Sequence, residues 1–284
     1  ESFTTTNGLP SNDISSLLFA NETLFIGTRK GFCSYSGNKI DSKQEYKKIK
    51  QLNSSLPAIF IHSLATIPSI HKLREVASLI RRHPETRLMI HIAEEPKERS
   101  IIKKRWGVSP LSVLQKTKLL GPKTVLIHGI YFTNKELSLI KKSGAAIVHC
   151  PSSNIATTGR TANLHRIVEM DIPFAIATDG LITAGSINVL EEARFCFSYH
   201  NSRKRTLIKS QQFFDAITIN AAAIFGMKSV IGSIEVGKKA DIAFLNLKNS
   251  GVAKLNPVKN IIESTTRPRI HSLMIGGNWK LKNG

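Results

Sequence analysis

The chain has 284 residues, of which 41% are hydrophobic, and a formal net charge of +20 at pH 7. This length can bury a sizeable core and suits one large domain with an appendage. No run approaches 18 apolar residues and no charged-then-apolar leader opens the chain, so we expect no membrane partner. The basic residues are scattered with few aromatic residues among them, which favours solvated lysine-rich faces over nucleic-acid binding.

The cysteines indicate a reducing environment. Cys33, Cys150 and Cys196 are odd in number and far apart in the sequence. This pattern argues against a disulfide scaffold, and its spacing matches no zinc motif. We therefore expect a cytoplasmic protein.

Residues 1–45 predict a separate β-rich segment. Short runs at Ser16–Phe19, Thr23–Ile26 and Gly31–Tyr35 are divided by Gly, Asn and Pro turns. The elements GLPSNDI and LFIGT resemble one blade of a sensor-type β-propeller repeat. The alternative is that these strands form half of a small β-sandwich beside the larger domain, and the residues leave both interpretations open.

Residues 46–225 predict parallel βα units. Short apolar runs alternate with stretches of helical period, such as 134–142 and 163–169, and the expected strands are 58–62, 88–92, 124–128, 145–149 and 174–178. Polar side chains stand at or just after the ends of these strands, where an α/β barrel carries its active site. A closed barrel needs eight strands, so we expect this one to lack its first strands.

The strand at 88–92 carries the clearest chemical signal. Side chains alternate along a strand, so Met89, His91 and Ala93 share one face, and Glu94 falls just past the strand end. A neutral imidazole is a good ligand for zinc or ferrous iron. A carboxylate three residues later, near the metal but outside its ligands, can transfer a proton.

Five motifs in order carry a family resemblance: MIHIAEEPKE, LIHG, VHCPSSN, IATDG, and the stretch 216–247 with TINAAAIFGM and IGSIEVGKKADIAFLNL. Together they resemble the amidohydrolase superfamily, in the branch of cytosine, guanine, adenosine and S-adenosylhomocysteine deaminases and chlorohydrolases. The resemblance covers roughly residues 57 to 284. It implies an α/β fold of the (β/α)8 TIM-barrel type, with residues 226–284 in a small flanking β-sandwich.

The resemblance also implies roles for particular residues. His91 and Asp179 match metal ligands, and His128 matches the histidine that polarises the activated water and is also taken as a metal ligand. Glu94 matches the proton-transferring acid, with His128 and Asp179 as its catalytic partners, and His62 matches a substrate-binding histidine. The implied cofactor is one divalent metal, zinc or iron(II). The implied reaction is hydrolytic deamination of a small heterocyclic substrate resembling a nucleobase or nucleoside.

The sequence also departs from this family. The resembled enzymes bind metal through an HxH pair on the first barrel strand, and no HxH occurs here. We therefore expect weak metal binding and impaired activity; the alternatives are a non-catalytic relic of the fold or a basic binding protein. His149 matches no ligand and is interpreted as structural with Cys150, whereas Ser152, Ser153 and Asn154 are interpreted as turn formers that can also cap a helix. Whether the chain forms a homo-oligomer stays open.

Overall fold

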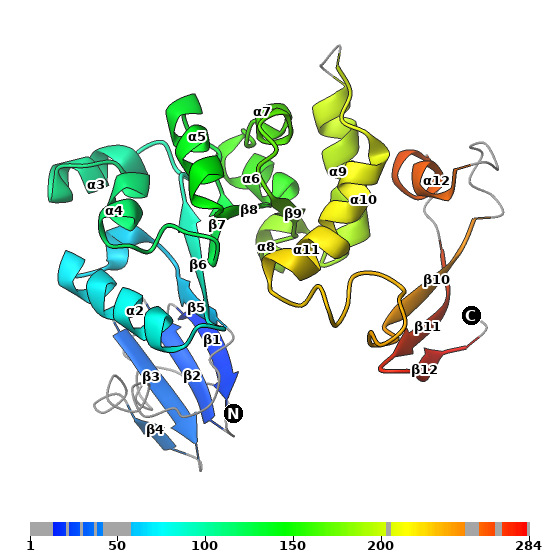
Figure 1. Cartoon of the computed structure of the whole chain (residues 1–284), viewed down its shortest axis with the longest axis horizontal. Helices are drawn as coiled ribbons and strands as arrows, with labels where there is room; N and C mark the ends of the chain where they lie inside the picture. Colours follow the sequence, from blue (N-terminus) through cyan, green and yellow to red (C-terminus); the bar gives the residue numbers. More distant parts are fainter. Residues whose placement is uncertain are drawn as a thin grey trace.

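The computed structural model describes strands at 14–20, 23–28, 31–36 and 39–41, and then residues 58–202, 206–247, 256–264 and 269–282. The first four strands form an antiparallel sheet in chain order. They are β1 (Ile14–Ala20), β2 (Thr23–Thr28), β3 (Gly31–Ser36) and β4 (Lys39–Asp41) (Figure 1). These strands lie within residues 1–45, for which the sequence predicts a β-rich segment.

The central element is a five-stranded parallel sheet whose strand order is the chain order. Its strands are β5 (Ala58–Ile61), β6 (Arg87–Ile92), β7 (Thr124–His128), β8 (Ala146–His149) and β9 (Phe174–Ile176). Each strand pairs in parallel with its neighbour in the sequence. All five predicted strands are present, and together with their helices they give the expected α/β architecture (Figure 1).

Helices connect these strands. They are the 3-10 helix η2 (Leu64–Thr66), α2 (Ile70–Arg82), α3 (Glu98–Trp106), α4 (Pro110–Lys116), α5 (Asn134–Ser143), α6 (Pro151–Thr158) and α7 (Leu164–Glu169). Their ends follow local chemistry: Ser69 caps α2 by accepting a hydrogen bond from the Lys72 backbone. Helix α5 begins with a capping box between Thr133 and Glu136 and ends at Gly144, whose φ of 74° favours glycine.

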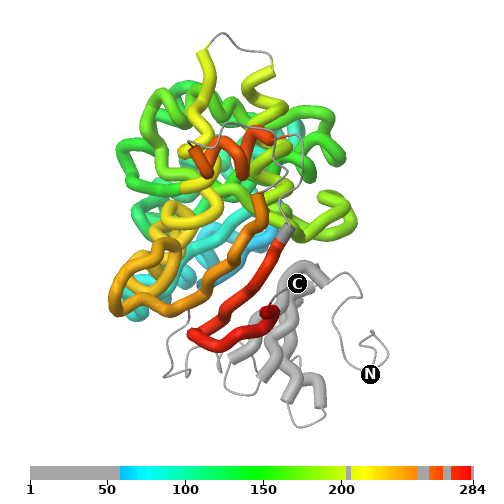
Figure 2. Tube along the Cα trace, turned by 90° about the vertical axis from the view of Figure 1, so that its right-hand side faces the viewer, coloured from blue at the N-terminus to red at the C-terminus, as the bar shows by residue number. Residues whose placement is uncertain are grey.

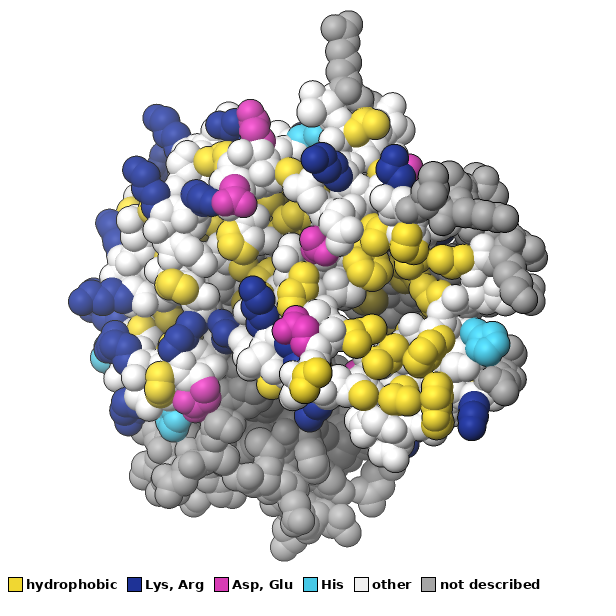
Figure 3. All heavy atoms as spheres, turned by 45° about the vertical axis from the view of Figure 1, so that its right-hand side comes forward, with side chains coloured by type: hydrophobic (Ala, Val, Ile, Leu, Met, Phe, Trp, Pro, Cys, Tyr) yellow, Lys and Arg dark blue, Asp and Glu magenta, His cyan; other side chains and the backbone are white. Residues whose placement is uncertain are grey.

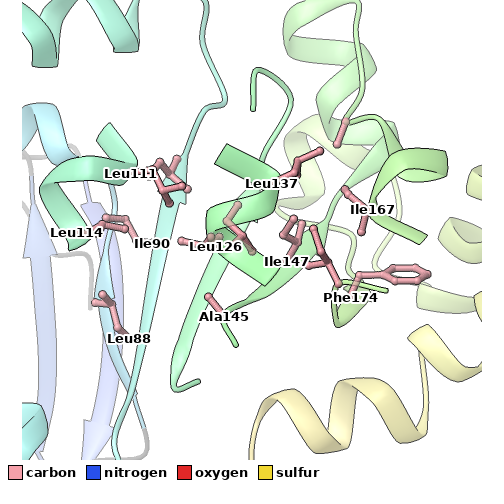
Figure 4. Packing of buried hydrophobic residues seen from close by; sticks show 14 of the residues in the cluster. Leu88, Ile90, Leu111, Leu114, Leu126, Leu137, Ala145, Ile147, Ile167 and Phe174 are labelled. Carbon is pink, nitrogen blue, oxygen red and sulfur yellow. The ribbon is translucent and has the colours of Figure 1, made fainter. Parts of the chain in front are cut away.

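The side chains on the two faces of the sheet pack into two separate clusters of buried residues. Leu88, Ile90 and Ile92 alternate along β6 toward the helix layer, where they join the larger core with residues of α4, α5 and α7 (Figure 4). The residues between them face a smaller cluster that contains Val125 and Val148 and is closed by Ile224. Because both faces are covered, the strands read as nearly continuous apolar runs.

The chain after β9 is helical before it returns to strands. Its elements are α8 (Leu181–Ala184), α9 (Val189–Asn201), α10 (Ser210–Ala216), α11 (Ile219–Ile224), β10 (Ile242–Asn246), α12 (Pro257–Glu263), β11 (Arg269–Ile275) and β12 (Asn278–Leu281). Strands β10, β11 and β12 form a second antiparallel sheet, and α12 packs on α9 and α10 (Figure 2).

The chain between residues 181 and 201 forms two helices, α8 and α9. Gly185 ends α8 in a left-handed conformation with φ of 71°, and Asn188 caps the new helix α9 by accepting from the backbone of Leu190 and Glu191. A glycine and a capping residue this close together favour a stop and a restart over one continuous helix.

In the view of Figure 3, most Lys and Arg side chains lie on the left of the molecule, whereas hydrophobic side chains gather to the right of its centre. None of the helices in the described part of the chain has the length and apolar character needed to cross a bilayer.

Candidate active site

Three histidines from neighbouring strands meet at the carboxyl edge of the central sheet. His62 directly follows β5, His91 lies in β6, and His128 ends β7. The ring centroids of His62 and His91 are 5.1 Å apart, and those of His91 and His128 are 4.7 Å apart. Parallel strands place their carboxyl ends at one edge, which explains this contact between residues distant in sequence.

Asp179 completes the group. One potential ligand atom from each of His91, His128 and Asp179 lies within 4.8 Å of the others. His128 is buried and His91 is half-buried, whereas Asp179 and His62 are exposed. The group is therefore anchored on one side and open to solvent on the other, as a site for a small substrate requires.

The protonation state of His91 suits metal binding. Burial, followed by the neighbouring rings of His128 and His62, lowers the pKa of His91 to about 4. Its imidazole is therefore neutral at physiological pH, and a nitrogen lone pair remains available as a ligand.

Strained backbone surrounds the site. Ala93, His128 and Asp179 have φ of 54°, 74° and 63°, values that residues other than glycine seldom adopt. His128 lies two residues after Leu126, so simple alternation would turn it toward the helix layer. The backbone of His128 is left-handed, and its ring contacts the ring of His91 rather than the helix layer. Strain of this kind concentrates at functional sites.

Helix α6 holds two of these side chains in place. Asn154 Oδ1 lies 2.8 Å from His128 Nδ1, and Ser153 Oγ donates a hydrogen bond to Asp179 Oδ2 over 2.6 Å. Both Ser153 and Asn154 are fully buried in the first turn of α6. The interpretation of Ser152, Ser153 and Asn154 as turn formers is therefore wrong, since they belong to a helix whose side chains contact the candidate site.

Glu94 faces the remaining nitrogen of His128. Its Oε2 lies 3.6 Å from His128 Nε2, which has no hydrogen-bond partner among the described residues. Because Oδ1 of Asn154 can only accept, Nδ1 of His128 carries the hydrogen, and the Nε2 of a neutral ring presents a lone pair. A buried nitrogen with a free lone pair beside a second imidazole and a carboxylate fits a divalent metal of the zinc type.

The turn that presents Glu94 has its own support. The Ala93 backbone donates a hydrogen bond to Oε2 of the buried Glu98 over 2.5 Å. Burial is the main cause that raises the pKa of Glu98 to about 7. Glu98 is the last residue of the MIHIAEEPKE motif, but no pattern in the sequence distinguishes it from the neighbouring glutamates.

His149 lies outside this group. Its Nε2 is 3.1 Å from Nε2 of His200 and 3.0 Å from Oγ1 of Thr161. It shares the helix-facing side of β8 with Ile147, a residue of the larger core. Cys150 is buried in the smaller cluster, on the other face of the sheet.

Comparison with known proteins agrees with this architecture. A family model described as "Amidohydrolase family" matches residues 3–280. A 5-methylthioadenosine/S-adenosylhomocysteine deaminase from Pyrococcus horikoshii is 30% identical over 281 residues, which cover 93% of this chain and 66% of that protein. A 5'-deoxyadenosine deaminase from Methanosphaera stadtmanae is 29% identical over 252 residues, covering 85% of this chain and 59% of that protein.

Solved structures show the same fold. An adenosine deaminase from Xanthomonas campestris with bound zinc superposes with a TM-score of 0.78 at 21% identity, over 87% of this chain and 58% of that one. The chain spans less than two thirds of the length of these relatives. The resemblance of residues 1–40 to a propeller repeat is not borne out, because the family match extends back to residue 3.

Proposed function

Because the chain belongs to the amidohydrolase family, we propose that it acts in the hydrolytic deamination of a nucleoside-like heterocycle. The observation that carries the proposal is the convergence of His91, His128 and Asp179, with ligand atoms within 4.8 Å of one another. Relatives named as methylthioadenosine, S-adenosylhomocysteine and deoxyadenosine deaminases support an adenine-bearing nucleoside as the substrate class.

The residues present fit a divalent metal, zinc or iron(II), held by His91, Asp179 and His128. When bound, such an ion supplies the Lewis acidity that makes water a nucleophile near neutral pH. The neutral state of His91 and the orphaned Nε2 of His128 are the features that support these ligand roles.

The remaining roles fall to side chains around the ligands. Glu94 would accept the proton of the attacking water and deliver it to the ring nitrogen, a transfer that typically contributes about 10²–10⁴-fold to the rate. Its place beside His128 supports this role. His128 would orient the reacting centre through Nε2, and Asp179 would assist in deprotonating the water. His62, exposed beside His91, would contact the substrate.

The number of ligands sets an expectation for affinity. The printed sequence contains no HxH pair, so three protein ligands are expected where the resembled enzymes use more. Each missing ligand lowers affinity, and a less enclosed ion activates water less well. We therefore expect this chain to hold its catalytic metal weakly.

Ammonia release tests the proposal. The purified chain would be assayed with added Zn²⁺ or Fe²⁺ on adenosine, S-adenosylhomocysteine, methylthioadenosine, guanine and cytosine, beside a His91→Asn/Asp179→Asn control. Metal-dependent turnover on an adenine nucleoside that disappears in the control supports the proposal. No turnover on any substrate at saturating metal would contradict it and favour a non-catalytic binding protein.

A further inference from the structure

A second cluster of potential ligands lies between the sheet and helix α9. One potential ligand atom from each of His149, Cys196 and His200 is within 4.8 Å of the others, and all three residues are buried. His149 ends β8, whereas Cys196 and His200 lie one turn apart on α9. The fold thus brings together groups that stand about 50 residues apart in the chain.

The buried face of α9 is unusually polar. Glu192, Cys196 and His200 are spaced four residues apart, so they form one line along the helix, and all are buried. Apolar residues at these positions would fill the same space without desolvating polar atoms. A carboxylate, a thiol and an imidazole in one buried line therefore need polar partners, which Ser152 supplies to Glu192 and His149 supplies to His200.

Hydrogen bonds within the cluster leave one atom unsatisfied. Nε2 of His149 contacts both His200 and Thr161, whereas Nδ1 of His149 is buried and has no hydrogen-bond partner among the described residues. Either tautomer of a neutral His149 leaves this atom unpaired. The two nitrogens of an imidazole point in different directions, so the unpaired Nδ1 lies away from His200, and Nε2 is the atom that His149 turns toward the cluster.

The distances suit a metal ion. Nε2 of His149 and Nε2 of His200 are 3.1 Å apart. Two imidazole nitrogens bound to tetrahedral zinc are separated by roughly 3.3 Å, given zinc–nitrogen bonds of about 2.0–2.1 Å. The separation of the two nitrogens is therefore within a few tenths of an ångström of the value in a zinc site.

We propose that His149, Cys196 and His200 form a second metal site, distinct from the candidate active site, which takes a divalent cation of the zinc type. Two imidazoles and a thiolate are the ligand types that zinc prefers in structural sites. Thr161, whose hydroxyl lies 3.0 Å from His149 Nε2, is the nearest further oxygen, so this hydroxyl or a water would complete four-coordination.

The electrostatics of the cluster are consistent with this site. Burial, then the neighbouring His200, lowers the pKa of His149, and burial, then His165, lowers that of His200 to about 4. Both rings are therefore neutral and can ligate without losing a proton. Burial raises the pKa of the Cys196 thiol, so loading must break its S–H bond and release one proton as the sulfur–metal bond forms.

Glu192 would balance the charge that remains. A divalent ion with one thiolate carries a net charge of +1, and the buried Glu192 lies one turn before Cys196 on α9. Its carboxylate also accepts hydrogen bonds from the backbone and hydroxyl of Ser152 on α6. The proposed ion would therefore tie β8, α6 and α9 together and act as a structural ion.

Sulfur ligation separates this site from the candidate active site, whose donors are nitrogen and oxygen. Because the cluster is buried, the metal should be present while the protein folds. The full chain would therefore be produced with Zn²⁺ or Co²⁺ in the medium and then dialysed. The wild type and the His91→Asn/Asp179→Asn variant should each retain one zinc with one sulfur neighbour by X-ray absorption. Their cobalt forms should show a thiolate-to-metal charge-transfer band.

Two cysteine variants identify the sulfur. Cys196→Ser should lose the retained metal and the charge-transfer band, whereas Cys150→Ser, altered at another buried cysteine, should keep both. A band that persists in Cys196→Ser, or a metal neighboured only by nitrogen and oxygen in the wild type, would overturn the proposal. If Cys196→Ser fails to fold, the presence or absence of a sulfur neighbour in the wild-type X-ray absorption spectrum still tests the proposal. Loss of deaminase activity alone leaves these readouts unchanged, so the two proposals fail independently.

Discussion

Nδ1 of His128 donates a hydrogen bond to Oδ1 of Asn154 over 2.8 Å, and this contact fixes which nitrogen of His128 faces the candidate site. Both side chains are fully buried. Since the amide oxygen can only accept, Nδ1 of His128 carries a hydrogen and Nε2 is the nitrogen turned toward Glu94. Asn154 is thus a positioning residue for the site, supplied by the first turn of α6.

Asn154→Ala should lower the free energy of unfolding by about 1–3 kcal/mol, because it leaves a buried imidazole N–H without an acceptor. Urea denaturation monitored by circular dichroism measures this change. Thr157→Ala on the exposed side of the same helix is the control and should cost less than about 0.5 kcal/mol. Equal losses in the two variants would mean that the contact with His128 contributes nothing specific.

Glu94→Gln should reduce turnover by about 10²–10⁴-fold while the metal content stays unchanged, because the amide keeps the shape but cannot carry the proton. Ammonia release and metal analysis on one preparation measure both quantities. Glu95→Gln changes an exposed neighbouring carboxylate and should leave turnover near the wild-type value. If Glu94→Gln also loses the metal, Glu94 is a ligand and its proposed role is wrong.

Glu98→Gln should stabilise the protein increasingly as the pH rises. The pKa of Glu98 is raised from its ordinary value of 4.5 to about 7, so the folded state holds a proton that the unfolded state releases between these values. The stability that Glu98 contributes is therefore fully present below pH 4.5 and is lost as the pH rises to about 7. A shift of this size corresponds to at most about 3 kcal/mol.

The unfolding free energies of the wild type and Glu98→Gln would be compared at pH 5 and pH 8. We expect the advantage of the variant to be larger at pH 8 by about 1–3 kcal/mol. Glu95→Gln, next to the same turn, should show no comparable difference. An advantage that is constant across this range would show that Glu98 is ionised in the folded protein.

Ala93→Gly should change the unfolding free energy by less than about 0.5 kcal/mol, although Ala93 is buried. The relief of left-handed strain at φ of 54° offsets both the lost methyl burial and the greater freedom of glycine in the unfolded chain. Ala175→Gly, in the middle of β9, gains no such relief and should cost about 1–2 kcal/mol. Similar costs in both variants would contradict the strain at Ala93.

The parallel sheet could be predicted from the sequence because each of its strands is marked by a pattern of neighbouring residues. Each strand is a short apolar run, and each run is followed by polar residues and a helical period. The alternation that placed His91 opposite Ile90 and Ile92 is likewise a property of one strand. These features require no knowledge of distant contacts, and the structure confirms them.

Other parts of the site depend on contacts that no local pattern contains. The left-handed backbone at His128 reverses the alternation of β7, and His is not a residue whose presence signals such a turn. Ser153 and Asn154 have the propensities of turn and cap residues, and only their partners, Asp179 and His128, reveal their contribution. The approach of Cys196 to His149 depends on the packing of α9 beside β9 and α6.

The order of the strands in the central sheet has a consequence for how the protein reaches its native state. From β5 to β9, every strand pairs with the one that precedes or follows it in the chain, and no strand inserts between two earlier ones. Pairings of this kind close short loops, which lowers the entropic barrier to folding. Each βα unit can therefore join the growing sheet soon after it leaves the ribosome, without waiting for the residues that follow.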